Sequence, residues 1–338
     1  MDRTKLERPF VSVIIPAYNP GPSLGLCVEA LFSSAFTGFE CIIVDDGSSS
    51  RTLPIPGIRK YPARVIRLTE NHGPAYARNR GAAAAMGDYL VFLDDDVLVQ
   101  KNTLDAIIAF FRENPRIDAV FGSYDNAPGH PGLISQYKNM FHHFIHQNSS
   151  SKASTFWAGC GAIKREVFLK VGGFRESFSR PSIEDIELGM RLVKNGYSIE
   201  LLKGLQVKHL KKWSFFNMIK SDIIYRGIPW TMWALKYRMI RNELNMQWNA
   251  RLSALCVFSY ATAVPLFWGH RLLPYLSLFF LITFFLLNLR FYSFFYREKG
   301  AIFTLSVFPM HLLYYIYSGF SLMLGFCFYR FSNIRKYG

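Results

Sequence analysis

Short apolar runs alternate with helical stretches over the first two hundred residues. Four runs have the length and composition of strands, at 11–15, 41–44, 64–68 and 89–93. Helical patterns lie between them, at 24–32 and 76–86. Strands that are apolar along most of their length are typical of a parallel sheet with both faces covered. The pattern predicts an α/β domain over 1–212, with a mostly parallel sheet and helices on both faces.

The pattern changes after residue 212. Residues 213–250 mix aromatic side chains with basic ones, and Phe216, Ile219 and Ile223 share one helical face. Such a face predicts amphipathic helices that lie in a membrane interface. A helix packed on the surface of a soluble domain is the alternative.

Three apolar segments follow, at 252–268, 272–289 and 301–329. Their lengths of about 17, 18 and 29 residues bracket the ~20 residues that cross a bilayer. Their basic flanks favour the cytosolic side of a membrane. We therefore expect 251–338 to form two or three spans and a short basic tail. The protein would then be a multi-pass protein of the cell (inner) membrane, with its α/β domain on the cytoplasmic side.

The formal net charge of +15 lies mostly toward the C-terminus. From Lys208 onward, 16 lysines and arginines face only three acids. Because nucleic-acid-binding proteins more often spread basic charge over a soluble face, no nucleic-acid partner is expected. Bases beside long apolar segments indicate an anionic membrane surface instead. The five cysteines are scattered without metal-ligand spacing, which is typical of a reducing compartment.

Acidic residues cluster where two of the predicted strands end. Asp45 and Asp46 follow the second run, and Asp94, Asp95 and Asp96 follow the fourth. The carboxyl ends of parallel strands meet at one edge of a sheet, where α/β proteins bind ligands. Carboxylates one residue apart can hold a hard cation such as Mg²⁺ or Mn²⁺. A solvated turn or a helix N-cap is the alternative for each cluster.

Two further positions add candidate chemistry. Glu184 and Asp185 open an amphipathic helical pattern. Capping explains one acid there, and the pair also offers a general base. His209 ends a strand-like stretch, and a lone histidine is more often structural than a metal ligand. Only the other candidate residues, which are mostly acids, support the interpretation of His209 as a metal ligand.

Five ordered motifs carry a resemblance to a known family. They are VSVIIPAYNP at 11–20, IIVDDGS at 42–48, NHGPAYARNRG at 71–81, the triplet at 94–96 and the acidic helix at 184–185. In order and spacing the chain resembles family 2 glycosyltransferases over about residues 9–215. The resemblance implies a GT-A fold, with a nucleotide-binding and an acceptor-binding half. It also implies inverting transfer of a sugar from a nucleotide-diphospho-sugar, such as a UDP-, GDP- or dTDP-sugar.

The resemblance assigns residues to the donor sugar nucleotide. Pro16, Ala17 and Tyr18 would wall the nucleoside pocket. Asp46, with Asp45 beside it, would bind the base. It places two more residues near the donor: Arg78 would support this pocket region or the diphosphate, and Asp95 would reach the ribose or a metal-bound water.

The resemblance also assigns the metal and the base. Asp94, Asp96 and His209 match residues that hold Mn²⁺ or Mg²⁺, and Asp185 matches the catalytic base. A group of residues around the base would form the acceptor site: Trp157, Gly159, Cys160, Glu184, Lys212 and Trp213.

One departure from the family bears on the product. Processive polysaccharide synthases carry Gln-x-x-Arg-Trp after the base helix, whereas here only Trp213 is kept and Lys212 is a loose match. Lysine lacks the bidentate fork that suits arginine to phosphate. We therefore expect non-processive transfer, to a hydroxyl or phosphate of a membrane-associated, lipid-linked acceptor. The alternatives are a processive synthase and a non-catalytic, glycan-binding membrane protein on a degenerate transferase fold. The first strand is not followed by GxGxxG, which disfavours a dinucleotide enzyme.

Overall fold

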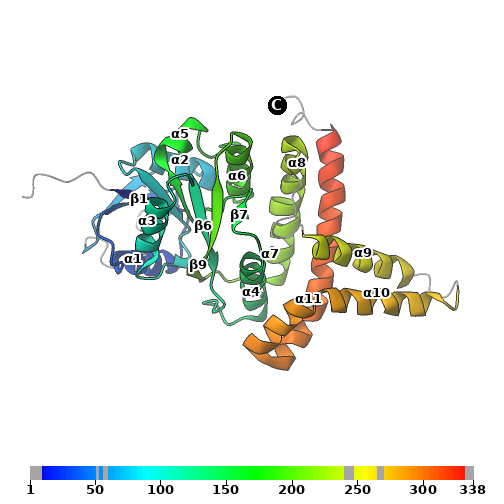
Figure 1. Ribbon diagram of the computed structural model, residues 1–338. Helices are drawn as coiled ribbons and strands as arrows, with labels where there is room; N and C mark the ends of the chain where they lie inside the picture. The colour runs from blue at the N-terminus through cyan, green and yellow to red at the C-terminus, as the bar shows by residue number, and fades with distance from the viewer. Residues whose placement is uncertain (1–9, 51–52, 56–59, 240–246, 265–269, 332–338) are drawn as a thin grey trace, which may run out of the picture. The chain divides into compact units, whose positions relative to one another are not determined.

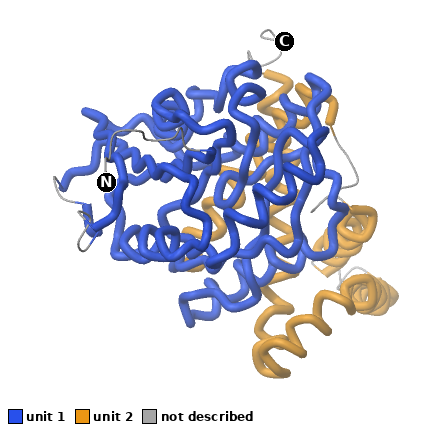
Figure 2. Tube along the Cα trace, turned by 60° about the vertical axis from the view of Figure 1, so that its left-hand side comes forward, with its two compact units in different colours: residues 1–212 blue, residues 213–338 orange. Residues whose placement is uncertain are grey.

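The computed structural model describes residues 10–50, 53–55, 60–239, 247–264 and 270–331. It divides into two compact units, residues 1–212 and 213–338 (Figure 2). The end of the apolar segment predicted at 252–268 and the predicted basic tail beyond Phe331 lie outside the described residues. Each unit is described by itself.

The first unit is built on one mixed sheet (Figure 1). Its strands follow the order β3-β2-β1-β4-β8-β6-β9-β5, and β7 pairs with β9. Their bounds are β1 Val11–Ala17, β2 Phe39–Asp45, β3 Ala63–Arg67, β4 Tyr89–Leu93, β5 Val97–Leu98, β6 Ala119–Tyr124, β7 Lys152–Ala153, β8 Cys160–Lys164 and β9 Ile199–His209. The four strands and two helices predicted from the sequence pattern are confirmed.

Helices cover both faces of the sheet, as predicted. One apolar core joins β1 to α1 and α3, and the other joins the sheet to α2, α5 and α6. The helix bounds are α1 Ser23–Phe32, α2 Pro74–Ala84, α3 Thr103–Glu113, α4 Leu133–Gln147, α5 Arg165–Lys170 and α6 Glu184–Lys194. Because both faces are buried, the central strands are largely apolar, and every residue of β1 is buried.

The strand directions bring the predicted site residues to one edge. The pairs β3–β2, β2–β1, β1–β4 and β6–β9 are parallel, while β8 is antiparallel to both β4 and β6. The carboxyl ends of β1, β2, β4, β6 and β9 therefore meet the amino end of β8. Register confirms the meeting, since Ala17 lies beside Asp45 and Leu93 lies beside Cys160.

The second unit is helical. Its helices are α7 Phe215–Lys220, η2 Ser221–Gly227, α8 Ile228–Tyr237, α9 Trp248–Ala263, α10 Leu273–Leu287 and α11 Leu289–Phe331. The segment predicted to lie in a membrane interface begins with α7, η2 and α8, which follow one another without a break. Of these, η2 and α8 contact α11. One of these contacts is a hydrogen bond of 2.8 Å from the Tyr317 hydroxyl to Asp222.

Among the described residues, only α11 is long and apolar enough to cross a membrane. The helices at the other two predicted spans are shorter, with 16 residues in α9 and 15 in α10. At 1.5 Å per residue these reach only about 22–24 Å, less than the ~30 Å of a bilayer core. One long apolar helix is weak evidence of membrane association, and the prediction of several spans is not supported.

The helix α11 contains a sharp break. Gly300 has φ 79° and ψ −179°, which no helix contains. Across it, Phe295 stacks on Phe303 and Phe291 stacks on His311. The hydroxyl of Tyr292 also lies 3.1 Å from His311 Nδ1. These pairings lie symmetrically about Gly300, so the first arm folds back along the second.

Candidate active site

The proposed base opens α6. Asp185 is the second residue of this helix. Its Oδ1 accepts a hydrogen bond from the Ile186 backbone (2.8 Å), and its Oδ2 accepts one from the Ala158 backbone (3.1 Å). Burial and the neighbouring Glu184 raise the pKa of Asp185 to about 6, against the lowering effect of Arg78. A carboxylate with a pKa near 6 is well matched to taking a proton at neutral pH.

A buried arginine joins the aspartate triplet to the base helix. Arg78, from α2 and only 5% exposed, donates to Asp94 Oδ1 at 2.7 Å and to Glu184 Oε1 at 2.8 Å. Glu184 is 4% exposed, and its second oxygen accepts from the Ser182 backbone. The arginine therefore neutralises a buried acid next to the base and fixes the start of α6 against the end of β4. The sequence predicted a donor-binding role for Arg78, whereas the structure places both of these bonds within the protein.

The outer aspartate of the triplet lies beside the predicted histidine. Asp96 Oδ2 is 3.6 Å from His209 Nε2. Burial alone would raise the pKa of Asp96, but the neighbouring His209 and Lys211 lower it. Burial and the two flanking acids raise the pKa of Asp95 to about 7. The residues predicted to bind metal are thus divided: Asp96 and His209 converge, and Asp94 is paired with Arg78.

The described residues contain no cluster of three or more His, Cys, Asp or Glu side chains that could hold a metal ion. The pair of Asp96 and His209 nevertheless fits a divalent ion of the Mg²⁺ or Mn²⁺ type. Such ions take oxygen or imidazole ligands and commonly use one or two protein side chains, with phosphate oxygens and water filling the remaining positions. A donor diphosphate would supply those oxygens.

The loop before β8 contacts both the proposed base and the aspartate triplet. Besides the bond from Ala158 to the base, the Gly159 carbonyl accepts from the Asp94 backbone. The Trp157 indole lies against Gly159, where an added Cβ would come within 2.4 Å of the ring. Cys160, predicted in the acceptor site, is fully buried in β8 and serves the core. Only glycine at position 159 therefore leaves room for the Trp157 ring in this place.

Sequence reasoning missed Tyr124, the last residue of β6. Its ring stacks on His209, with centroids 4.2 Å apart and planes 13° apart. The Trp157 ring meets Tyr124 edge to face at 4.7 Å. The only available signal was position, since Tyr124 ends a strand at the functional edge of the sheet.

The predicted base-binding acids are both used by the fold. Asp46 Oδ1 and Oδ2 accept from the backbones of His72 (3.0 Å) and Gly73 (2.7 Å). Asp45 is fully buried and pairs with Arg67 at 2.7 Å. The bonds of Asp46 attach the segment before α2 to the end of β2, and the pair of Asp45 with Arg67 joins β2 to β3. A role for either carboxylate in binding a base remains a prediction.

Two loops beside β1 are tied together. Asn19 Oδ1 accepts from the Ser49 backbone and hydroxyl, and the Asn19 backbone donates to the Ser48 hydroxyl. Of the residues predicted to wall the nucleoside pocket, Pro16 and Ala17 are buried in β1, while Tyr18 is 52% exposed. Tyr18 is thus available to a ligand. The sequence did not single out Asn19 or the two serines.

The last two predicted acceptor residues lie at the boundary between the units. Lys212 ends the first unit and is exposed, whereas Trp213 begins the second. Their roles toward an acceptor remain predictions.

Replacing Gly47 with alanine should destabilise the protein by about 2–3 kcal/mol. Gly47 has φ +71°, and an added Cβ would lie 2.4 Å from the Glu70 carbonyl carbon, which is backbone and cannot rotate away. Thermal unfolding followed by circular dichroism measures the effect. Gly196→Ala is the matched control, because Gly196 has φ +83° with nothing within 4 Å of its added Cβ. Equal melting temperatures for the two variants would show that the close approach of residue 70 is unimportant.

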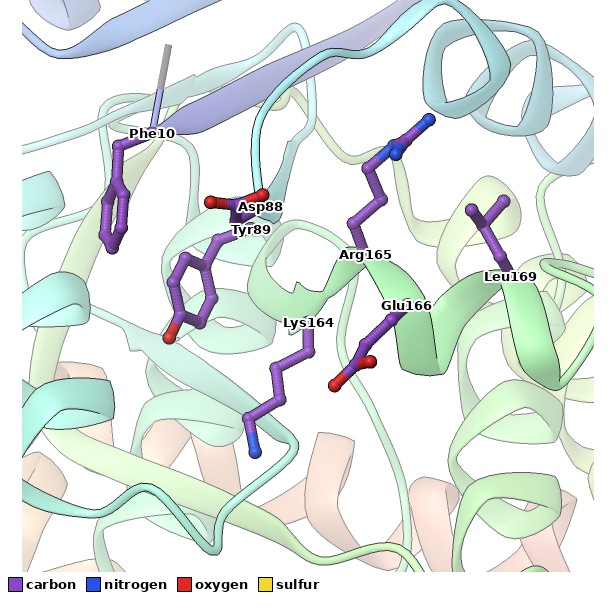
Figure 3. Close-up of a pocket in the computed structure, with 7 residues that line it drawn as sticks. All are labelled: Phe10, Asp88, Tyr89, Lys164, Arg165, Glu166 and Leu169. Atoms are coloured by element: carbon purple, nitrogen blue, oxygen red, sulfur yellow. The ribbon is translucent and has the colours of Figure 1, made fainter. Parts of the chain in front are cut away.

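A hollow of about 460 Å³ lies at the opposite edge of the sheet (Figure 3). It is lined by Phe10, Asp88, Tyr89, Lys164, Arg165, Glu166 and Leu169. Tyr89 begins β4 and Lys164 ends β8, so this hollow is a full strand length from the aspartates. It is no part of the candidate active site.

A solved structure has the same fold. The chain resembles the mannosyltransferase PcManGT from Pyrobaculum calidifontis, solved in complex with GDP-Man and Mn²⁺, with a TM-score of 0.50 at 16% identity. The match covers 94% of this chain and 88% of the other. The fold is therefore of the GT-A class, as the resemblance implied.

Sequence comparisons match the chain to glycosyltransferases. Residues 12–172 match Glycosyl transferase family 2, and residues 138–219 match the N-terminal domain of galactosyltransferase. An uncharacterized glycosyltransferase of Haemophilus influenzae is 30% identical over 194 residues, which are 55% of this chain and 62% of that protein. Glycosyltransferase GlyG of Streptococcus pneumoniae is 32% identical over 120 residues, covering 35% and 40% of the two chains. Together with the fold, these matches support a family 2 glycosyltransferase. The chain spans less than two thirds of the length of these relatives.

Proposed function

We propose that the protein transfers a sugar, with inversion, from a nucleotide-diphospho-sugar to a hydroxyl or phosphate of a membrane-associated acceptor. The observation that carries this proposal is the placing of Asp185 at the same sheet edge as Asp96 and His209. Asp185 contacts Ala158, and the next residue, Gly159, contacts Asp94. A base and a site for an anionic leaving group are thus held by one loop.

The base acts on the acceptor. A hydroxyl oxygen of the acceptor attacks the anomeric carbon while the Asp185 carboxylate takes its proton. The bond from the anomeric carbon to the diphosphate oxygen breaks, and the nucleoside diphosphate leaves with the electron pair. Glu184, the adjacent acid, is engaged by Arg78 and Ser182. Glu184 is thereby not available as a second carboxylate nucleophile beside Asp185, which supports direct displacement and hence inversion.

The divalent ion belongs to the proposal too. Asp96 and His209 would hold Mn²⁺ or Mg²⁺, and when bound the ion would stabilise negative charge on the diphosphate as a Lewis acid. The protein's own contribution is to hold these two side chains together at the end of β4 and β9. PcManGT was solved with Mn²⁺, which supports this choice of metal.

The acceptor is proposed to lie in or on a membrane, and a lipid-linked acceptor is the chemical class that we favour. The apolar helix α11 supports membrane attachment. Basic flanks support a cytoplasmic active site at the inner membrane. The loss of the Gln-x-x-Arg-Trp pattern around Lys212 and Trp213 supports one transfer per encounter.

The rate should fall below pH 6. Asp185 must be ionised to accept a proton, and its pKa is about 6. Below that value kcat/KM should drop about tenfold per pH unit, and above it the rate should level off. Initial rates between pH 5 and 8 measure this. Asp95→Asn is the control, because it removes the other acid whose pKa is raised, to about 7, and should leave the break near pH 6 in place. A wild-type profile that is flat down to pH 4.5 contradicts the assignment.

The function itself is tested with radiolabelled UDP-, GDP- and dTDP-sugars, native membranes, and Mn²⁺ or Mg²⁺. Products are divided into lipid and aqueous phases. Label in the lipid phase, absent with Asp96→Ala, supports transfer to a lipid-linked acceptor. Label only in the aqueous phase rules out the lipid acceptor, and no transfer or hydrolysis of any donor favours the non-catalytic alternative.

A further inference from the structure

The side chain of His209 is buried, and its ring stacks on that of Tyr124. The backbone of His209 is held by pairing with Val97 in β5 and by the Gly129 amide. Its imidazole, 6% exposed, lies flat against the Tyr124 ring and points Nε2 toward Asp96. The Tyr124 hydroxyl is 3.4 Å from Nε2, a long distance for a hydrogen bond.

Tyr124 is itself held from two directions. The Trp157 ring packs edge to face against it, and His143 Nδ1 lies 2.7 Å from its backbone carbonyl. Trp157 in turn sits on Gly159, where only a glycine leaves room. A continuous series of contacts thus runs from the acceptor-side loop through Tyr124 to His209.

We infer that Tyr124 is a positioning residue that sets the orientation of His209 and thereby the affinity for the divalent ion. This inference rests on the metal-binding role proposed above for Asp96 and His209. Stacking fixes the plane of the imidazole, and the plane determines where Nε2 points. The ring of Tyr124, rather than its hydroxyl, supplies the effect, because the hydroxyl is too distant for a strong bond. Outer residues that orient metal ligands commonly change affinity by about 10–100-fold.

The test is Mn²⁺ binding by the full-length protein in detergent, followed by the loss of the free Mn²⁺ signal in electron paramagnetic resonance. Mn²⁺ alone is the probe. Tyr124→Leu should weaken the site by about tenfold or more, because leucine fills space but cannot stack. Tyr124→Phe keeps the ring and should stay within about twofold of wild type. Tyr89→Leu is the matched control, since Tyr89 stacks on Phe111 at the other end of the sheet and should leave binding unchanged.

Each outcome decides the matter. Wild-type affinity in Tyr124→Leu overturns the inference, provided that its circular dichroism spectrum matches wild type. Equal weakening in Tyr124→Phe and Tyr124→Leu also overturns it, since the hydroxyl would then act. A wild-type protein without an Asp96-dependent Mn²⁺ site overturns this inference. The metal part of the proposed function, in which a donor diphosphate supplies further oxygens, is overturned by sugar transfer without added metal. Such transfer would leave the rest of the proposed function standing.

Discussion

Asp185→Asn should lower sugar transfer at saturating substrate by about 10²–10⁴-fold, the usual contribution of a positioned general base. Asparagine keeps the size of the side chain and an oxygen that can accept from the Ala158 backbone, but it cannot take a proton. Nothing else among the described side chains replaces it, because Glu184 beside it is bonded to Arg78. Initial rates of transfer, measured as nucleoside diphosphate release, check the result.

The same substitution should not lower the melting temperature at pH 7. The pKa of Asp185 is raised to about 6 by burial, so the folded state disfavours the charge that is present above that pH. Removing the charge relieves this cost at neutral pH and leaves little change below about pH 3, where the side chain is protonated in both states. Glu166→Gln, at an exposed position on the opposite edge, is the control and should change neither property. Wild-type turnover in Asp185→Asn would refute the mechanism.

Arg78→Met should destabilise the protein by about 3–5 kcal/mol. Methionine fills much of the same volume but leaves the buried Glu184 without a counter-charge, and it also frees Asp94. Breaking a buried ion pair on one side costs this much because the remaining charge stays desolvated. Urea unfolding of the full-length protein in detergent, followed by tryptophan fluorescence, measures the change.

A double variant separates the lost charge from lost packing. Arg78→Met with Glu184→Gln removes both charges and should recover at least about half of the lost stability. Arg80→Met, an exposed arginine on the same helix whose partner is Glu176 at 3.5 Å, should cost less than about 1 kcal/mol. If the double variant were less stable than Arg78→Met alone, the pairing would not be the source of the effect.

The strand ends that form the site could be predicted from the sequence, because the hydrophobic pattern and the geometry of parallel sheets both point to them. Apolar runs fixed the strands, and parallel pairing carried Asp45 and Asp94 to one edge. The base helix was also predictable, since Asp185 opens an amphipathic pattern. Each of these conclusions depends on residues close together in the sequence.

The partners of these residues could not be predicted. Arg78 reaches Glu184, which is 106 positions away, and no local pattern reports such a contact. The resemblance placed Arg78 near the donor. In the structure it donates hydrogen bonds to two carboxylates of the protein, those of Asp94 and Glu184. Tyr124 was missed for the same reason, because its contact with His209 forms only once β6 and β9 are paired. Local patterns predict strand ends, and tertiary packing decides which side chains meet.

The C-terminal helices show a different limit. Residues 290–299 were expected to connect two apolar segments, and the structure instead makes them the first arm of α11. Hydropathy cannot detect such an arm, because Arg290, Arg297 and Lys299 mask its buried aromatic face. The face consists of Phe291, Tyr292 and Phe295, and it is buried against the second arm.

The fold-back at Gly300 fixes how deep a membrane-crossing α11 can sit. Because Phe291 stacks on His311, the charged first arm lies level with residues 301–311 of the second. If the arginines of that arm lie at the level of the lipid headgroups, residues 301–311 lie at that level as well. Residues 312–331 remain for the hydrocarbon, and at 1.5 Å per residue they measure about 30 Å, the thickness of a bilayer core. If α11 crosses a membrane, the turn at Gly300 would limit this helix to one crossing and would set the depth of that crossing.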